Sequence, residues 1–103
     1  MRFKNEAGVK GEVKRILKQH GAWFAMPHQR GFSQYGVPDI LACHHGIFLG
    51  IETKFGKNKP TRNQWIQGGR IEKAGGVFLV IYEDDMDVLE RTLQEIEQRC
   101  GRS

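Results

Sequence analysis

Two carboxylates and a lysine have the types and spacing to do chemistry: Asp39 precedes one short apolar segment, and Glu52 and Lys54 end the next. Adjacent carboxylates repel each other, and they keep their charge at low cost only when a cation lies between them. A ligand set made only of oxygens favours Mg²⁺ or Mn²⁺ over zinc, and the backbone carbonyl of Thr53 could be a further ligand. Lys54 would then lie where it can orient or activate a water molecule, or stabilise charge that builds up on a phosphate.

The two segments that carry these residues are expected to form a β-hairpin. Residues 40–43 and 47–54 have strand composition and are joined by a tight turn. Because side chains alternate along a strand, Glu52 and Lys54 share one face of the second strand. Asp39, at the beginning of the first strand, can then lie beside Glu52.

The segments around the hairpin predict helices and further strands. In chain order we expect a helix at 9–20, a strand at 22–26, the hairpin, a helix at 62–74, a strand at 77–82 and a last helix from 85 or 87 to about 99. The strand at 77–82 is a continuous apolar run, so we expect it to be buried on both faces. It follows a helical crossover, which favours parallel pairing with an earlier strand. The fold class is therefore α/β, with a mixed sheet of about four strands flanked by helices, in a single domain over residues 1–103.

The charge of the chain is unevenly distributed. The net charge is +4, but residues 1–82 hold thirteen Lys or Arg and only five Asp or Glu, whereas residues 83–103 hold three and seven. A basic body permits a nucleic-acid partner without proving one. The acidic end is typical of a solvated terminal helix, and we expect it to face away from a polyanion.

The remaining composition excludes several classes of protein. Two cysteines are too few for a disulfide framework and indicate a reducing compartment. There is no apolar run near the ~20 residues that cross a bilayer, and no signal-peptide pattern. We therefore expect no membrane partner and a place in the cytoplasm of a bacterium or of a phage-infected host.

The order of the motifs resembles a known nuclease signature. Gly36-Val37-Pro38-Asp39, followed by Ile51-Glu52-Thr53-Lys54, resembles the PD-(D/E)XK pattern. A basic Gly/Lys loop, a glutamine in the next helix and a Gly-Gly pair before an apolar strand make the chain similar to the VRR-NUC branch, which includes compact phage-type proteins and the catalytic domain of Fanconi-associated nucleases. It is also similar to archaeal Holliday-junction resolvases. The resemblance covers roughly residues 6–82, and it implies a restriction-endonuclease-like core, metal-dependent hydrolysis of DNA, often at branched structures, and often a homodimer.

The resemblance also suggests two further site residues. Gln64 matches the glutamine that follows the family motif, where it would hold Lys54 or a water molecule, although a plain surface amide is nearly as good an interpretation. The family usually completes its metal site with a glutamate on the first helix, and here Glu6 and Glu12 compete. At about 100° per residue, Val13 lies within roughly 20° of the direction of Glu6, whereas Glu12 points about 120° away. We therefore expect Glu6 to join the site and Glu12 to be a solvated surface residue.

The basic residues after the hairpin are the expected DNA contacts. Lys57, Lys59 and Arg62 follow Lys54 within nine residues that contain no acid. Such a run is usually a solvated loop. Beside a candidate metal site it is better interpreted as a surface that binds the DNA backbone, and we expect Arg30 to contribute to the same surface.

The run Cys43-His44-His45 also raises the question of zinc. We considered that interpretation and disfavoured it, because Cys100 is the sole other thiol in the chain and no C-x-x-C spacing is present. Cys43 is better interpreted as a small core residue.

These observations together predict a Mg²⁺-dependent endodeoxyribonuclease. Asp39, Glu52 and the Thr53 carbonyl would hold one or two ions, and a water molecule activated there would attack the phosphorus in line. Any preference for branched DNA such as Holliday junctions would come from the spacing of two active sites in a homodimer, and a role in DNA repair would fit it. The alternatives are a non-catalytic DNA-binding module with a nuclease fold, and a restriction-type endonuclease.

Overall fold

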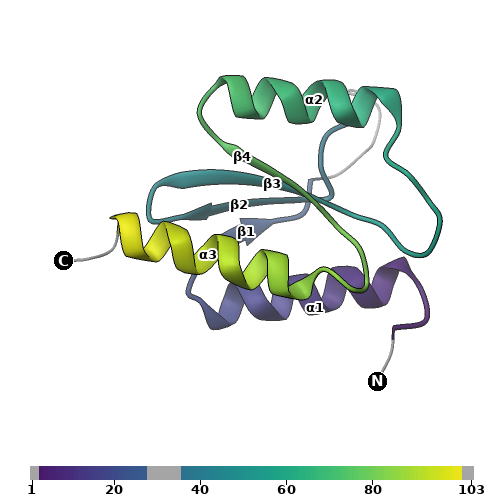
Figure 1. The fold of residues 1–103 in the computed structure, drawn as a ribbon, viewed down its shortest axis with the longest axis horizontal. Coiled ribbons are helices and arrows are strands. Elements are labelled where there is room, and N and C mark those ends of the chain that lie inside the picture. The colour runs from purple at the N-terminus through teal and green to yellow at the C-terminus, as the bar shows by residue number, and fades with distance from the viewer. Residues whose placement is uncertain (1–2, 28–35, 101–103) are drawn as a thin grey trace.

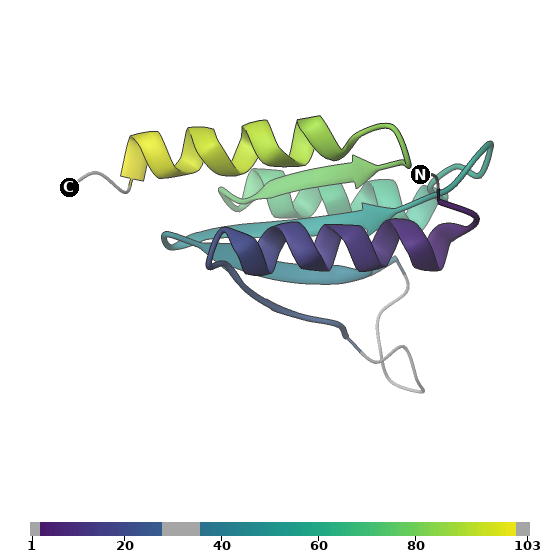
Figure 2. The ribbon, with the colours of Figure 1, turned by 90° about the horizontal axis from the view of Figure 1, so that it is seen from below.

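The computed structural model describes residues 3–27 and 36–100, and it is a three-layer α/β/α domain (Figure 1). The elements are α1 (Glu6–Gln19), β1 (Trp23–Ala25), β2 (Ile40–His44), β3 (Ile47–Thr53), α2 (Arg62–Lys73), β4 (Val77–Ile81) and α3 (Met86–Cys100). The helix α2 covers one face of the sheet, and α1 and α3 cover the other (Figures 1 and 2). The expected α/β class, the order of elements and the mixed four-stranded sheet are confirmed.

The sheet has the order β1-β2-β3-β4, in which only the last pair is parallel. The hairpin of β2 and β3 pairs Ile40 with Ile51, and the same antiparallel register continued by one residue places Asp39 opposite Glu52. Strand β3 therefore lies in the middle of the sheet, with β4 parallel to it as the helical crossover predicts.

Strand β4 differs from the expectation that it is buried on both faces. It lies at an edge of the sheet, and within it Ile81 is buried while the residues from 77 to 80 are partly exposed. Its continuous apolar run reflects contact with α2 on one face and α3 on the other, but an edge strand keeps one side open to solvent.

The core lies mainly between the sheet and the pair α1 and α3. Its fully enclosed members include Val13 and Leu17 from α1, Ile51 from β3 and Leu93 from α3. Helix α1 begins three residues earlier than expected, because Asn5 accepts a hydrogen bond from the Gly8 amide and caps the first turn.

Helix α2 packs on the opposite face at short range. The Cβ that an alanine would add at Gly68 lies 2.3 Å from the Phe78 ring, so the missing side chain lets α2 approach β4. Gly36 makes a similar approach at the start of α2, where an added Cβ would lie 2.4 Å from the Asn63 carbonyl oxygen. Its φ of +83° is in the region that favours glycine. These two approaches fix how closely α2 packs on β4 and where its first turn stands relative to the segment before β2.

Candidate active site

The hairpin brings the predicted carboxylates together at one end of the sheet. Asp39 lies at the entry to β2, and Glu52 lies one residue before the end of β3. Lys54 is the first residue after β3, and its Nζ is 3.4 Å from Oε2 of Glu52. The expected sharing of one face by Glu52 and Lys54 agrees with this ion pair.

Asp39 is held by the end of β3. Its Oδ2 accepts a hydrogen bond of 3.0 Å from the Thr53 backbone N–H and one of 2.8 Å from the Thr53 hydroxyl. Thr53 is fully buried, so these bonds fix the carboxylate at the strand end. Thr53 was predicted to take part through its carbonyl, and the structure gives it this additional contact to Asp39.

Glu52 is the most constrained of the three side chains. Only 1% of it is exposed, and its Oε1 has no hydrogen-bond partner among the described residues. Burial, reinforced by the neighbouring charge of Asp39, raises the pKa of this carboxyl to about 7, although Lys54 acts in the other direction. A buried carboxylate oxygen without a partner is costly. This oxygen, beside a second carboxylate, fits a divalent cation with oxygen ligands, so the residues present are suited to Mg²⁺ or Mn²⁺.

Gln64 reaches the site from the first turn of α2. Its Nε2 donates a hydrogen bond of 2.7 Å to Oε2 of Glu52, and its Oε1 accepts one of 2.7 Å from the Thr61 N–H. The Thr61 hydroxyl accepts from the Gln64 N–H in return, which completes a capping box. The described contacts of Gln64 are therefore with Glu52 rather than with Lys54, because the capping box directs its amide toward β3.

The two glutamates of α1 have different surroundings. Glu12 forms an ion pair with Arg15 at 2.6 Å on the helix surface, and the hydrogen bond from Arg15 lowers the pKa of Glu12. That pairing agrees with its expected place as a solvated residue. Glu6 opens α1, which begins at the same end of the sheet where β3 finishes (Figures 1 and 2). Within the described residues, no group of three metal-ligating atoms includes Glu6, so its part in the site stays a prediction.

The architecture matches a solved structure. A chain described as "VRR_NUC domain" superposes with a TM-score of 0.68 and 27% sequence identity, over 84% of this chain and 94% of that chain. This chain has the VRR_NUC fold. A scan against protein-family models finds no match, and no curated protein matches the sequence. The VRR_NUC fold implies a nuclease family and hence DNA binding.

The basic segment of the VRR_NUC fold that follows β3 is anchored at two points. The Tyr82 hydroxyl donates a hydrogen bond of 2.6 Å to the Asn58 carbonyl, and the Glu83 carboxylate accepts one of 3.0 Å from the Gly56 N–H. Lys57 and Lys59 are exposed on this loop. The loop therefore presents two cations from a fixed backbone. Arg62, at the start of α2, is also exposed, and Arg30 lies outside the described residues.

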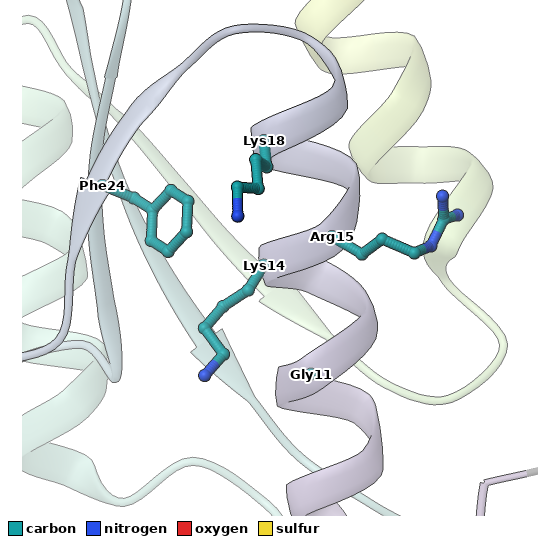
Figure 3. Close-up of a pocket in the computed structure, with 5 residues that line it drawn as sticks. All are labelled: Gly11, Lys14, Arg15, Lys18 and Phe24. Atoms are coloured by element: carbon teal, nitrogen blue, oxygen red, sulfur yellow. The ribbon is translucent and has the colours of Figure 1, made fainter.

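A surface hollow lies elsewhere, between α1 and β1. It has a volume of about 390 Å³ and is lined by Gly11, Lys14, Arg15, Lys18 and Phe24. Lys18 extends toward the Phe24 ring, Lys14 extends past it along the same side of α1, and Arg15 extends toward α3 (Figure 3). None of these residues belongs to the carboxylate site, so the hollow is a second basic surface.

No helix in the described part of the chain is long and apolar enough to span a bilayer. Those segments do contain one group that could hold a metal ion, formed by His20, His44 and Glu97. The sequence singled out His44 but paired it with Cys43, which is only partly buried. His20 and Glu97 were missed because neither stands at a recognisable ligand spacing from His44.

Proposed function

We propose that this chain is a metal-dependent endodeoxyribonuclease with Asp39, Glu52 and Lys54 at its active site. The observation that carries the proposal is the buried Glu52 oxygen without a partner, beside a second carboxylate and a lysine. An ion pair that served stability alone would leave no such oxygen, since an orphaned buried acceptor costs about 1–3 kcal/mol.

Each residue has a distinct part in the proposed reaction. Asp39, Glu52 and the Thr53 carbonyl would hold Mg²⁺ or Mn²⁺, which supplies a Lewis acid and lowers the pKa of water when bound. Lys54, held by Glu52, donates hydrogen bonds to the phosphate and offsets the charge that develops on it. Gln64 is a positioning residue that fixes one oxygen of Glu52. Glu6 would complete the acidic set from α1.

The exposed cations next to this site are the proposed contacts for DNA. Lys57, Lys59 and Arg62 lie on the loop and helix that directly follow β3, and Arg30 is included on sequence grounds alone. Contacts of this kind bind phosphates without reading bases. Selectivity would therefore come from DNA shape, and we propose branched substrates such as four-way junctions, cut by a homodimer.

One cleavage assay tests the reaction. Labelled duplex, flap and four-way-junction DNA are incubated with Mg²⁺ or with EDTA, using the natural chain, Lys54→Ala and the control Lys73→Ala, which changes an exposed lysine at the end of α2. We expect Mg²⁺-dependent cutting that is fastest on branched DNA, lost in Lys54→Ala and retained in Lys73→Ala.

The other outcomes identify the alternatives. Binding without Mg²⁺-dependent cutting would indicate a non-catalytic DNA-binding module. Cutting at one base sequence whatever the DNA shape would indicate a restriction-type enzyme. Cutting that survives Lys54→Ala would contradict the site. Light scattering tests the homodimer separately, and a mass near one chain, with and without junction DNA, would contradict it.

A further inference from the structure

A second set of metal-ligating side chains lies at the hairpin-turn end of the sheet. His20 caps the C-terminus of α1, His44 ends β2, and Glu97 lies in the last turns of α3. All three elements meet at this end, opposite the end where β3 finishes (Figures 1 and 2). Asp39 and His44 are five positions apart along an antiparallel strand, which corresponds to about 17 Å. The cluster is therefore separate from the proposed active site.

The two imidazoles converge on a single carboxylate oxygen. His20 Nδ1 is 2.6 Å and His44 Nε2 is 2.8 Å from Oε2 of Glu97. The two rings are nearly perpendicular, at 86°, with their centroids 6.1 Å apart. One ligand atom from each residue lies within 4.8 Å of the others. Three donors from three separate elements thus already point at one small volume.

Glu90 holds the other side of the His20 ring. Its Oε1 is 2.6 Å from His20 Nε2. A metal ion takes only one nitrogen of an imidazole, and ligating histidines usually donate their second N–H to a carboxylate, which fixes the tautomer and the ring orientation. Glu90 is in that position, about two turns of α3 before Glu97.

The charges at the cluster favour a cation. Two carboxylates, Glu90 and Glu97, face the imidazoles of His20 and His44. Burial disfavours a proton on His20, but the hydrogen bonds to Glu97 and Glu90 raise the pKa of His20 overall. Hydrogen bonds from both histidines lower the pKa of Glu97. A divalent ion between two neutral imidazoles and these carboxylates would neutralise the cluster without the proton.

We propose that His20 Nδ1, His44 Nε2 and a Glu97 oxygen bind one Zn²⁺ ion, with Glu90 as a positioning residue. Two imidazoles and a carboxylate suit zinc and disfavour Mg²⁺. The three protein ligands leave a fourth tetrahedral position for water. Binding displaces the proton on His20 Nδ1 to solvent. Because His44 is only 3% exposed while Glu97 is one-third exposed, the ion can enter from the α3 side.

The ion would link the end of α1, the end of β2 and α3. These elements are far apart in the chain, since His20 and Glu97 are 77 positions apart and His44 and Glu97 are 53. A ligand that binds only the folded chain stabilises it by mass action. Zinc should therefore raise the thermal midpoint of this protein.

The test is a Zn²⁺ titration of the full chain, stripped of metal and held in excess Mg²⁺ to occupy the carboxylate site. Isothermal titration calorimetry and the shift in melting midpoint are the readouts. We expect one Zn²⁺ per chain, release of a proton, and a higher midpoint. Glu97→Gln should weaken binding by about 100-fold or more, because it removes a ligand, and Glu90→Gln by about 10–100-fold, because it loosens His20.

Matched variants guard against nonspecific effects. Glu95→Gln changes an exposed residue of the same helix and should bind zinc as the natural chain does. Glu52→Gln should also leave this binding unchanged. His20→Ala removes a second proposed ligand, at the end of α1. It is preferred to a change of His44, which is buried. Absence of saturable zinc binding, or binding that Glu97→Gln and His20→Ala leave intact, would overturn the proposal, as would equal loss in Glu95→Gln.

Discussion

The Gln64 side chain donates a hydrogen bond of 2.7 Å to Oε2 of Glu52, which links the first turn of α2 to the end of β3. The same amide closes the capping box of α2 through Thr61. One side chain therefore couples the start of a helix to the orientation of a buried carboxylate. If Glu52 is a metal ligand, this contact fixes the orientation of its other oxygen, Oε1.

Replacement of Gln64 by alanine tests that coupling. We expect Gln64→Ala to weaken the apparent affinity for Mg²⁺ by about 10–100-fold, because a partner that orients a ligand is lost. The measurement is the Mg²⁺ concentration that gives half-maximal cutting. Thr61→Ala is the matched control, since it damages the same capping box without touching Glu52. Equal effects of the two changes would mean that helix capping, and not the contact to Glu52, is what matters.

The place of Asp39 beside Glu52 could be predicted because it depends on local rules. A tight turn and strict alternation set the register of the hairpin, and the register sets which residues face each other. The predicted pairing agrees with Ile40 opposite Ile51. The partner of Gln64 could not be predicted in the same way. It depends on where α2 docks, and the close approaches at Gly36 and Gly68 that fix this docking are tertiary contacts.

The His20, His44 and Glu97 cluster was beyond sequence reasoning for a similar reason. Its members come from a helix end, a strand end and a distant helix, and no short spacing joins them. The edge position of β4 is a related case. The apolar run at 77–82 predicts a strand, but whether another strand covers its outer side depends on the topology of the sheet.

Glu52 should make the metal-free protein less stable as the pH rises. Its pKa is raised from 4.5 to about 7 in the folded chain, so the folded state holds a proton that the unfolded state has released between these values. The resulting stability is fully present below pH 4.5 and is lost as the pH rises through about 7. We expect a loss on the order of 3 kcal/mol, because each unit of difference in pKa corresponds to about 1.4 kcal/mol.

Urea unfolding in EDTA between pH 4.5 and pH 8 measures this loss. Glu52→Gln should flatten the curve, because the amide does not titrate, and the difference between the two proteins isolates Glu52 from His20, whose raised pKa acts with the same sign. Glu72→Gln is the control for an exposed acid. Parallel curves for the natural chain and Glu52→Gln would contradict the prediction.

Two glycines with nearly the same φ angle allow the cost of a left-handed backbone to be distinguished from the cost of a steric contact. Gly36 has φ +83° and Gly46 has φ +82°, but only Gly36 has a neighbour, the Asn63 carbonyl, where a Cβ would be added. Gly46→Ala should cost about 1 kcal/mol of unfolding free energy from the left-handed backbone alone. Gly36→Ala should cost more, by about 1–3 kcal/mol, because α2 must move. Equal losses in chemical denaturation would mean that the approach to α2 is not tight.

The two basic surfaces allow a charge-matched test of the DNA contacts. Lys57→Ala with Lys59→Ala removes two cations beside the proposed active site, and Lys14→Ala with Lys18→Ala removes two from the hollow next to Phe24. Each phosphate contact that is lost should lower the slope of log affinity against log salt by about one. We therefore expect the first pair to reduce both affinity and slope for junction DNA, and the second pair to change them little.

Fluorescence anisotropy over a range of salt concentrations measures both quantities. Equal losses from the two pairs would mean that the DNA responds to the overall charge of the body rather than to the loop after β3.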